Sequence, residues 1–349
     1  MRALILTELA GPRALRFTDA DEPDPAGRVL VEVRAAGLIY PDLLMSYGRY
    51  QLKIPPPFVP GSEIAGVVLS APEGSRFAPG QDVVGVSGTG GFAERVALED
   101  SQLFPMSKHL DHAEAASMLV NHQTVHFALV RRAGLRRGDT VLVLGPAGGV
   151  GSAAVAVAKA LGARVIAVVH RAGAEDFLRG LGADEVVALA DGWAAQVREL
   201  TAGAGVDIVV DPVGGDAFDD AVRVLAPEGR LVVLGFAGGA IPQAKVNRLL
   251  MRNISVVGAG WGEFLRTHPT ALAETVAALD GLVDRGLRPP APARYPLALG
   301  AVAMADLESG QILGKAVLVT DELVTDELVT DELVTDELVT DELVTDDDG

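Results

Sequence analysis

The chain of 349 residues contains no cysteine. That absence excludes disulfides, cysteine-bound zinc, iron–sulfur ligation and thiol nucleophiles together. Long apolar runs are also missing, because no stretch approaches the ~20 residues that a membrane-spanning helix needs. The N-terminus, beginning Met1-Arg2-Ala3, resembles a strand and lacks a signal-peptide cleavage site. We therefore expect a cytoplasmic protein without a membrane partner, and its 49% of hydrophobic residues can build large cores.

An excess of basic residues is missing as well. The formal net charge is −18, but residues 320–349 hold 13 acidic residues and no Lys or Arg, which leaves −5 for residues 1–319. The remaining chain is mildly acidic and shows no basic stripe. A nucleic-acid partner is therefore not expected.

The C-terminal segment repeats Leu-Val-Thr-Asp-Glu, with starts every five residues from Leu318 to Leu343. A period of five matches neither the helical period of 3.6 nor the strand period of 2. We predict a disordered acidic tail over 320–349, derived from tandem expansion of the preceding Leu-Val-Thr-Asp. The alternative is an acidic tail that serves in interactions.

The N-terminal third, residues 1–120, is predicted to be mostly β-structure. Segment 53–60 must be extended, because its four prolines forbid a helix. Turns rich in Gly and Pro separate the candidate strands. This pattern is typical of a small barrel with long loops, whose candidate strands are 3–6, 29–35, 63–70, 82–85 and 92–97.

The pattern changes at residue 113, where helices and apolar strands begin to alternate. Near-continuous Val, Leu and Ile in the strands indicate burial on both faces. The alternation predicts an α/β fold with a doubly wound parallel sheet. A helix over 263–285 and a last strand over 315–319 return the chain to the first domain. The strands predicted for the parallel sheet are 140–144, 164–169, 185–188, 206–210, 230–234 and 254–258.

The first motif that indicates a ligand is a glycine-rich turn, Gly145-Pro146-Ala147-Gly148-Gly149-Val150-Gly151. An apolar strand precedes it and a helix follows, so the helix N-terminus offers N–H groups to a pyrophosphate. The strict G-x-G-x-x-G spacing is absent, because Pro146 stands at its first glycine. The turn predicts a nucleotide phosphate site, and the alternative is a structural turn without ligand.

Several blocks resemble the medium-chain dehydrogenase/reductase superfamily. They include Arg-Ala-Ala-Gly at 34–37, Phe-Val-Pro-Gly-Ser-Glu-Ile-Ala-Gly at 58–66 and Val-Asp-Ile-Val-Val-Asp-Pro-Val-Gly-Gly at 206–215. Within it, the chain is similar to the zinc-free, zeta-crystallin-like NADPH:quinone oxidoreductase branch. The resemblance implies a GroES-like catalytic domain (1–120, with 263–319), a Rossmann NADPH-binding domain (121–262), a cleft between them and a homodimer.

Zinc-dependent relatives carry Cys and His where this chain has Ile39 and Ser62, so no metal is expected. His122 and His126 have the i, i+4 spacing of a metal pair, but no third ligand follows from the sequence. A packed pair is the favoured interpretation.

The cofactor preference is predicted from the end of the second Rossmann strand. NAD enzymes place a carboxylate there, whereas this chain has His170 and Arg171, which can bind a 2′-phosphate. Relatives often add a Lys where Ala174 stands. NADPH is therefore the predicted cofactor, and the alternative is a solvated surface arginine. The resemblance implies further cofactor contacts at Tyr50, Thr124, Gly214, Gly235, Phe236, Ala237, Gly260 and Trp261.

The expected chemistry is hydride transfer to a quinone or similar enone, assisted by a hydrogen bond to the oxygen that gains charge. Tyr50 matches a family tyrosine and is the candidate donor, unless it is a structural loop aromatic. Relatives often have Asn where this chain has Ile39, so a polar group of the cleft is missing. Its possible substitutes are Tyr40, Asp42, Tyr47 and His126. Leu52, Ile54, Phe264 and Trp261 would form an apolar wall. The alternatives are an enoyl or enal double-bond reductase and an NADPH-binding protein with low turnover.

Overall fold

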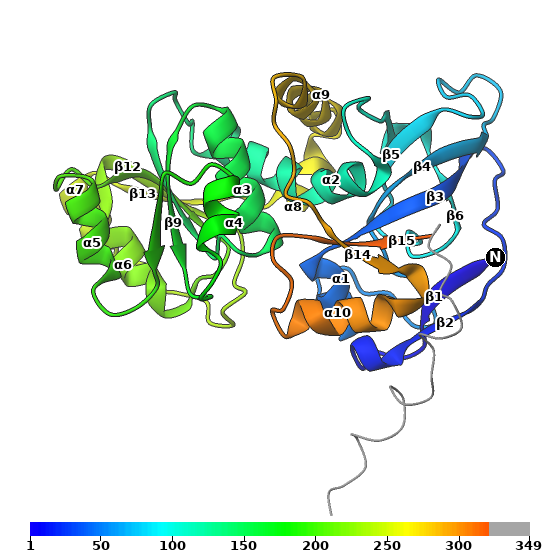
Figure 1. Cartoon of the computed structure of the whole chain (residues 1–349), viewed down its shortest axis with the longest axis horizontal. Helices are drawn as coiled ribbons and strands as arrows, with labels where there is room; N and C mark the ends of the chain where they lie inside the picture. The colour runs from blue at the N-terminus through cyan, green and yellow to red at the C-terminus, as the bar shows by residue number, and fades with distance from the viewer. Residues whose placement is uncertain (321–349) are drawn as a thin grey trace, which may run out of the picture.

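The computed structural model describes residues 1–320, so the predicted tail lies, apart from Thr320, outside the described residues. Two large sheets lie side by side along the long axis, with helix α2 between them (Figure 1). One is a six-stranded parallel sheet in the order β10-β9-β8-β11-β12-β13. The other, here called the N-terminal sheet, has the order β14-β15-β3-β4-β5-β7, with β6 paired to β3. The α/β fold predicted from the sequence is confirmed.

The N-terminal sheet is largely antiparallel and encloses a core that includes Leu4, Leu6, Ile64 and Phe92, all at most 1% exposed. In the first six residues of β3 buried and half-buried residues alternate, as one solvated sheet face requires, and the last four are all buried. The last strand, β15, pairs with β3, so the segment after α9 (Ala271–Asp284) completes the sheet begun by the first 120 residues. The elements of this part are β1 (Arg2–Leu6), β2 (Leu15–Asp19), β3 (Val29–Leu38), α1 (Tyr40–Ser46), β4 (Glu63–Ser70), β5 (Asp82–Val86), β6 (Arg95–Leu98), β7 (Leu103–Pro105), β14 (Ala293–Pro296), α10 (Gly300–Glu308) and β15 (Ala316–Val319).

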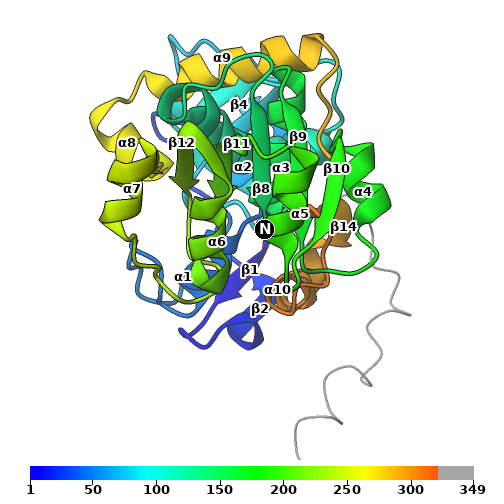
Figure 2. The ribbon, with the colours of Figure 1, turned by 90° about the vertical axis from the view of Figure 1, so that its left-hand side faces the viewer.

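The parallel sheet has a core on each face. One contains side chains of α3 and α4, and the other contains side chains of α5 and α6. Figure 2 turns this half of the molecule toward the viewer. Both faces are covered, which is why the strands are continuous apolar runs. Its elements are β8 (Thr140–Leu144), α3 (Gly149–Ala160), β9 (Arg164–Val169), α4 (Glu175–Gly180), β10 (Glu185–Ala188), α5 (Trp193–Leu200), β11 (Val206–Asp211), α6 (Phe218–Arg223), β12 (Leu225–Val233), α7 (Val246–Arg252) and β13 (Ser255–Gly258).

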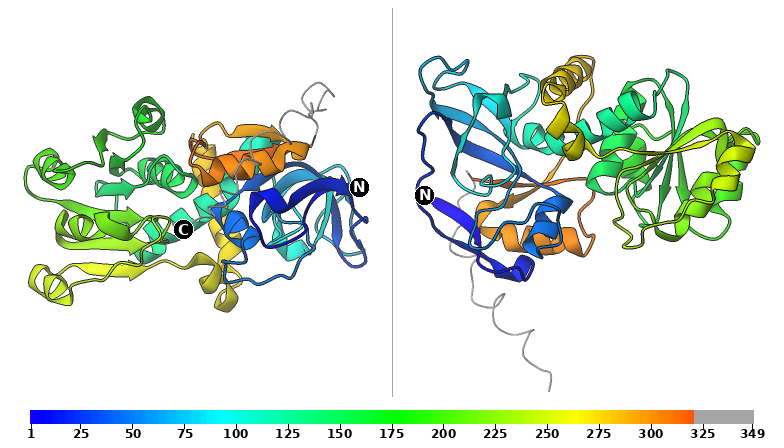
Figure 3. Two further views of the ribbon diagram at one scale, coloured as in Figure 1. Left: turned by 90° about the horizontal axis from the view of Figure 1, so that it is seen from below. Right: turned by 180° about the vertical axis from the view of Figure 1, so that it is seen from behind.

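Helix α2 (His112–His126) joins the two halves and packs on both. It begins at Asp111, whose carboxylate accepts from the Glu114 N–H at 2.8 Å. Beyond His126 the helix continues as one wider π-helical stretch (Phe127–Arg132). Helices α8 and α9 lie beside α2 at the junction (Figure 3).

The single helix predicted over 263–285 is wrong. The structure has α8 (Trp261–Thr267) and α9 (Ala271–Asp284), separated at Pro269. A proline ring clashes with the preceding helical turn and disfavours helix at the residue before it, so the helix ends at Thr267. Among the described residues, no helix is both long enough and apolar enough to cross a membrane. The exact domain boundaries stay a prediction.

Candidate functional site

The glycine-rich turn lies between β8 and α3 at the carboxyl edge of the parallel sheet. Gly145 has φ 57°, a left-handed conformation that favours glycine. A Cβ on Gly151 would stand 2.1 Å from the Gly145 carbonyl oxygen, and a Cβ on Gly149 would stand 2.4 Å from Asn121 Nδ2. Gly145 and Gly151 therefore require glycine for the turn itself, while Gly149 lies close to the Asn121 side chain of α2.

Gly148 is different, because its φ is −89° and a Cβ there would meet only the Gly145 oxygen, at 3.7 Å. The turn is therefore open at Gly148, which precedes the first residue of the 12-residue helix α3. N–H groups of a first helical turn have no partner within the helix, and the helix dipole is positive there. An open glycine turn before a helix N-terminus fits a pyrophosphate, and Ala147 and Val150 belong to the same turn.

Arg171 follows β9 at the same sheet edge, and its guanidinium crosses to the other half of the molecule. Nη1 donates to the Gly310 carbonyl at 2.9 Å and Nη2 to the Gln311 carbonyl at 2.6 Å. A guanidinium carries five N–H donors, so three remain for a phosphate. His170 is exposed beside it. The structure thus positions the predicted pair at the sheet edge and ties the arginine to the loop after α10.

The turn after β11 is held by Asp211, a residue that the sequence interpretation did not assign to the site. Its Oδ1 accepts from the N–H groups of Val213 and Gly214 at 2.9 and 2.8 Å. Oδ2 is buried and has no partner among the described residues. Burial raises the pKa of this carboxyl, although the two hydrogen bonds that it accepts lower it. A buried carboxylate oxygen without a partner at the sheet edge is a candidate ligand contact. In the sequence, the only trace of it is an Asp at the end of an apolar run.

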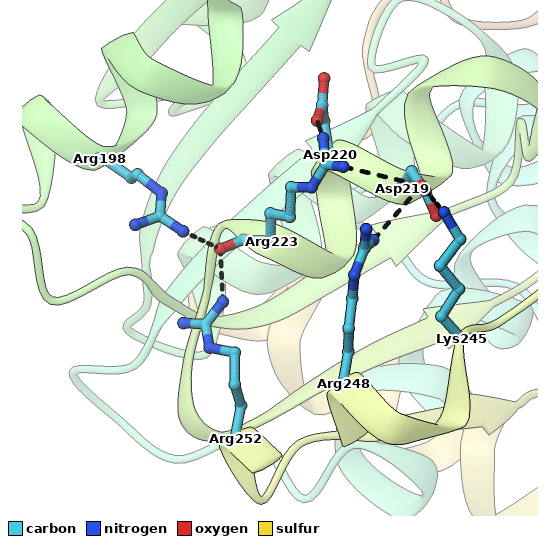
Figure 4. Close-up of polar contacts among 7 residues, drawn as sticks. All are labelled: Arg198, Asp219, Asp220, Arg223, Lys245, Arg248 and Arg252. Atoms are coloured by element: carbon cyan, nitrogen blue, oxygen red, sulfur yellow. Dashed lines mark hydrogen bonds and ion pairs between the residues drawn. The ribbon is translucent and has the colours of Figure 1, made fainter. Parts of the chain in front are cut away.

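The loop after β12 folds over this turn. The Ala237 N–H donates to the Pro212 carbonyl at 3.1 Å, while Phe236 is 42% exposed and Gly235 starts the loop. Helix α7, where the loop ends, is anchored to α6 by Asp219, which pairs with Lys245 at 3.4 Å and Arg248 at 3.3 Å (Figure 4).

The backbone of α6 supplies a second anchor. Arg198 and Arg252 both donate to the Arg223 carbonyl, at 2.6 and 2.7 Å (Figure 4). Two charged donors thus satisfy one C-terminal carbonyl of α6 and tie α5 and α7 to it. Together with Asp219, they fix the end of the loop that covers the sheet edge.

Three other predicted residues lie in α2 or at the start of the neighbouring helix α8. Thr124 Oγ1 donates to the Val120 carbonyl of its own helix at 2.7 Å. Trp261, which follows Gly260, is 7% exposed, and its indole N–H donates to Gln123 Oε1 at 3.3 Å. The Trp261 ring lies 5.1 Å from that of Phe127. The structure therefore gives Trp261 a packed position between α8 and α2 rather than an open face.

Tyr50 is half-buried in the loop after α1, and its hydroxyl has no hydrogen-bond partner among the described residues. Burial, followed by the charge of Asp42, raises its pKa. The hydroxyl thus keeps its proton at neutral pH and can donate it in a hydrogen bond. Leu52 is 49% exposed nearby in sequence, and Ile54 is half-buried.

A hydrogen-bonded cluster occupies the positions of the zinc ligands in relatives. Ile39 is buried, and its N–H donates to Asp42 Oδ2 at 3.0 Å. Ser62 Oγ lies 2.9 Å from Asp42 Oδ1 and 3.1 Å from the Gly88 carbonyl. Asp42 is fully buried, which raises its pKa to about 7. Among residues 1–320, no group of three or more His, Cys, Asp or Glu side chains could hold a metal ion.

The neighbouring residues tie this cluster to α2. Glu63 forms a buried ion pair with Lys315, and its other oxygen accepts from the Val120 N–H at 2.7 Å. His122 is buried, and burial followed by the Lys315 charge lowers its pKa to about 3. It is therefore neutral, and neither ring nitrogen has a partner among the described residues. Burial also lowers the pKa of half-buried His126.

The remaining substitutes for the missing Asn differ in position. Tyr40 is 44% exposed at the start of α1. Tyr47 packs against Gly11, where a Cβ would stand 2.2 Å from its ring, and a hydrogen bond to Glu308 raises its pKa. Phe264 stacks on His268 with ring centroids 4.1 Å apart. Asp42 and Tyr47 are thus engaged in hydrogen bonds, whereas Tyr40, Tyr50 and His126 have no side-chain hydrogen-bond partner among the described residues. Of these three, Tyr50 is a half-buried hydroxyl, and Tyr40 is exposed.

Two family profiles match this chain. The alcohol dehydrogenase GroES-like domain matches residues 25–108, and the zinc-binding dehydrogenase profile matches residues 149–278. Rat quinone oxidoreductase-like protein 2 is 35% identical over 82% of this chain and 82% of its own length.

Two solved structures share the whole fold. A probable oxidoreductase from Mycobacterium abscessus is 51% identical, with a TM-score of 0.86 over 92% of this chain and 99% of its own. The quinone oxidoreductase from Thermus thermophilus, solved also in complex with NADPH, is 34% identical, with a TM-score of 0.78 over 92% of this chain and all of its own.

Proposed function

Because the chain belongs to the medium-chain dehydrogenase/reductase superfamily and has quinone oxidoreductase-like relatives, we propose that it is an NADPH-dependent reductase of quinones or similar conjugated carbonyls. The observation that carries the proposal is the sheet edge itself. An open glycine cradle and a cationic side chain lie at the carboxyl ends of adjacent strands β8 and β9. That arrangement suits a dinucleotide with a third phosphate.

The chain's residues would divide the binding of NADPH between them. Gly148 and the N-terminus of α3 receive the pyrophosphate, and Arg171 with His170 receives the 2′-phosphate. Gly214, Gly235, Phe236 and Ala237 line the same edge, with Thr124 and Gly260 toward the junction. When bound, NADPH supplies a hydride from C4 of its nicotinamide ring.

The acceptor would lie beside Tyr50, whose free hydroxyl donates a hydrogen bond to the oxygen that gains negative charge. A quinone reduced in this way takes one hydride from NADPH and one proton from solvent to become the hydroquinone. The protein then needs only to position the acceptor and stabilise the charged oxygen. Leu52 and Ile54 provide apolar surface for the ring.

The test follows NADPH oxidation with 1,4-benzoquinone, 9,10-phenanthrenequinone and a crotonyl-type enoyl substrate in parallel. Turnover of the quinones, with the enoyl substrate at least tenfold slower, is expected. Preference for the enoyl substrate would instead identify a double-bond reductase, and Tyr50→Phe should impair such an enzyme more, because it must protonate carbon. Tight NADPH binding without turnover would identify a low-turnover NADPH-binding protein.

A further inference from the structure

A groove of about 640 Å³ runs between the parallel-sheet half and the connection from α9 to β14. Its apolar lining comes from Phe177 and Leu181 of the α4 segment, Leu282 and Leu287 at the end of α9, and Pro290. Figure 1 shows the connection descending from α9 past α3 and α4 to β14. The groove residues contributed by α3 lie at the C-terminal end of that helix, about 12 Å from the glycine-rich turn. The groove is therefore separate from the nucleotide cradle.

The charge of this groove is positive. Lys159, Arg285 and Arg288 line it, and none of the described lining residues is acidic. Lys159 pairs with Asp184 at 2.6 Å, and Arg288 donates to backbone carbonyls at the end of α9. The exposed Arg285 guanidinium has no polar partner among the described residues. The groove thus has a cationic rim over an apolar floor, although residues 1–319 carry a net charge of −5.

The chain itself contains a segment of the complementary chemistry. Residues 321–349 hold 13 Asp and Glu, no Lys or Arg, and Leu-Val pairs at every fifth residue. Each repeat thus offers two carboxylates beside two aliphatic side chains. Carboxylates can pair with Arg285 and Arg288, and the aliphatic pair can cover Phe177 and Pro290.

The length of this segment is sufficient for it to reach the groove. Phe177 lies against Gly314, where a Cβ would stand 3.0 Å from its ring, so the chain passes the groove just before β15. From there to Thr320 the chain moves about 20 Å away. The 29 residues beyond Thr320 can span up to roughly 100 Å. A tethered segment within reach acts at an effective concentration of roughly millimolar.

From this juxtaposition we infer that the acidic repeat segment of the chain binds in its own groove between α3, α4 and the α9–β14 connection. The contact joins the two halves of the molecule at a place that the proposed hydride transfer does not use. The inference is independent of the proposed function, since it concerns neither cofactor nor acceptor.

Cysteine cross-linking in the full chain tests the inference directly, because the protein has no native cysteine. One pair joins Ala160→Cys, at an exposed groove position, to Thr335→Cys in the repeat segment. The control pair joins the same Thr335→Cys to Ala26→Cys, at an exposed position before β3. The rate of disulfide formation is followed by non-reducing electrophoresis and mass spectrometry at low protein concentration.

The groove pair is expected to cross-link at least about threefold faster than the control pair, and 0.5 M NaCl should abolish the difference. Arg285→Glu in the groove pair should remove the advantage, while Arg13→Glu, an exposed arginine on the N-terminal half, should leave it unchanged. Equal rates for the two pairs overturn the inference. So does a cross-linked dimer as the main product, or an advantage that survives Arg285→Glu.

Discussion

At the residue scale, the proposed role of Arg171 is to make the protein prefer NADPH over NADH. Replacing it in Arg171→Met should weaken NADPH binding by about 10- to 100-fold, because a charge-assisted hydrogen bond to phosphate is worth about 1.5–3 kcal/mol. NADH lacks that phosphate, so its affinity should change less than about threefold. Titration calorimetry of both cofactors measures the two dissociation constants.

The same variant also loses the bonds to Gly310 and Gln311. That loss affects both cofactors alike, so NADH serves as the internal reference. Arg179→Met, an exposed arginine on neighbouring α4, is the matched control and should alter neither constant. If wild-type protein binds NADH and NADPH equally, Arg171 does not select the cofactor.

Asp42 gives the stability a pH dependence of unusual sign for a carboxyl. Burial raises its pKa from 3.8 to about 7, so the folded protein holds a proton that the unfolded chain releases. The stabilising effect is complete below pH 3.8 and is lost as the pH rises through about 7. Linkage makes the loss about 2–3 kcal/mol between pH 5 and pH 8.

Asp42→Asn removes this titration with little change of shape. The amide oxygen can accept from the Ile39 N–H, and the amide NH₂ can donate to Ser62 Oγ, which itself can donate to the Gly88 carbonyl. Urea unfolding should show wild type losing stability relative to the variant from pH 5 to pH 8. Exposed Asp19→Asn is the control. A constant difference between wild type and Asp42→Asn across this range would contradict the assignment.

At the scale of elements, two glycines in the turn between β8 and α3 have different expected roles. One is needed for the fold of the turn, and the other only for cofactor binding. In Gly151→Ala the new Cβ would stand 2.1 Å from the Gly145 oxygen, so the melting temperature and the binding of both cofactors should fall. In Gly148→Ala the nearest atom is 3.7 Å away, and φ is negative. That variant should keep its melting temperature within about 2 °C and bind both cofactors more than tenfold more weakly. Unchanged binding in Gly148→Ala would place the pyrophosphate elsewhere.

The elements also show what sequence periodicity can and cannot predict. Strands β8 and β9 lie where runs of Val, Leu and Ile predict them, because burial on both faces leaves one residue class along the strand. Helices α1 and α7 are short and were missed, since seven residues carry too little periodicity. Pro269 does carry a breaker signal for the division of α8 from α9, and weighing it would have corrected that prediction.

The candidate site divides in the same way. Local backbone demands, such as the glycines of the turn, are visible in the sequence because each requires one residue type. The carbonyls that hold Arg171 come from residues 139 and 140 positions away, and Lys315 meets Glu63 across 252 positions. Such long-range partners carry no local pattern, so the sequence alone could not assign them.

At the scale of the whole molecule, one apolar surface is left without a partner. Ile241, Val246, Leu250 and Met251 are each 73–79% exposed, on α7 and the loop before it. They adjoin β13, the last strand of the parallel sheet, whose outer edge is unpaired among the described residues. Exposed apolar patches and open strand edges are the features that association covers. We therefore expect a second copy of the chain to pack here, in keeping with the homodimer that the family resemblance implies.

Light scattering coupled to gel filtration should then give twice the 36.2 kDa of one chain. The double variant Leu250→Lys, Met251→Lys should give a monomer. In a C2 interface the same patch of both subunits meets, so the variant would bring four lysines into one apolar contact. Val302→Lys, at a 48% exposed position on α10, should remain a dimer. A monomeric wild type at micromolar concentration, or a lysine variant that stays dimeric, would remove α7 and β13 from the interface and leave their apolar surface to a different partner.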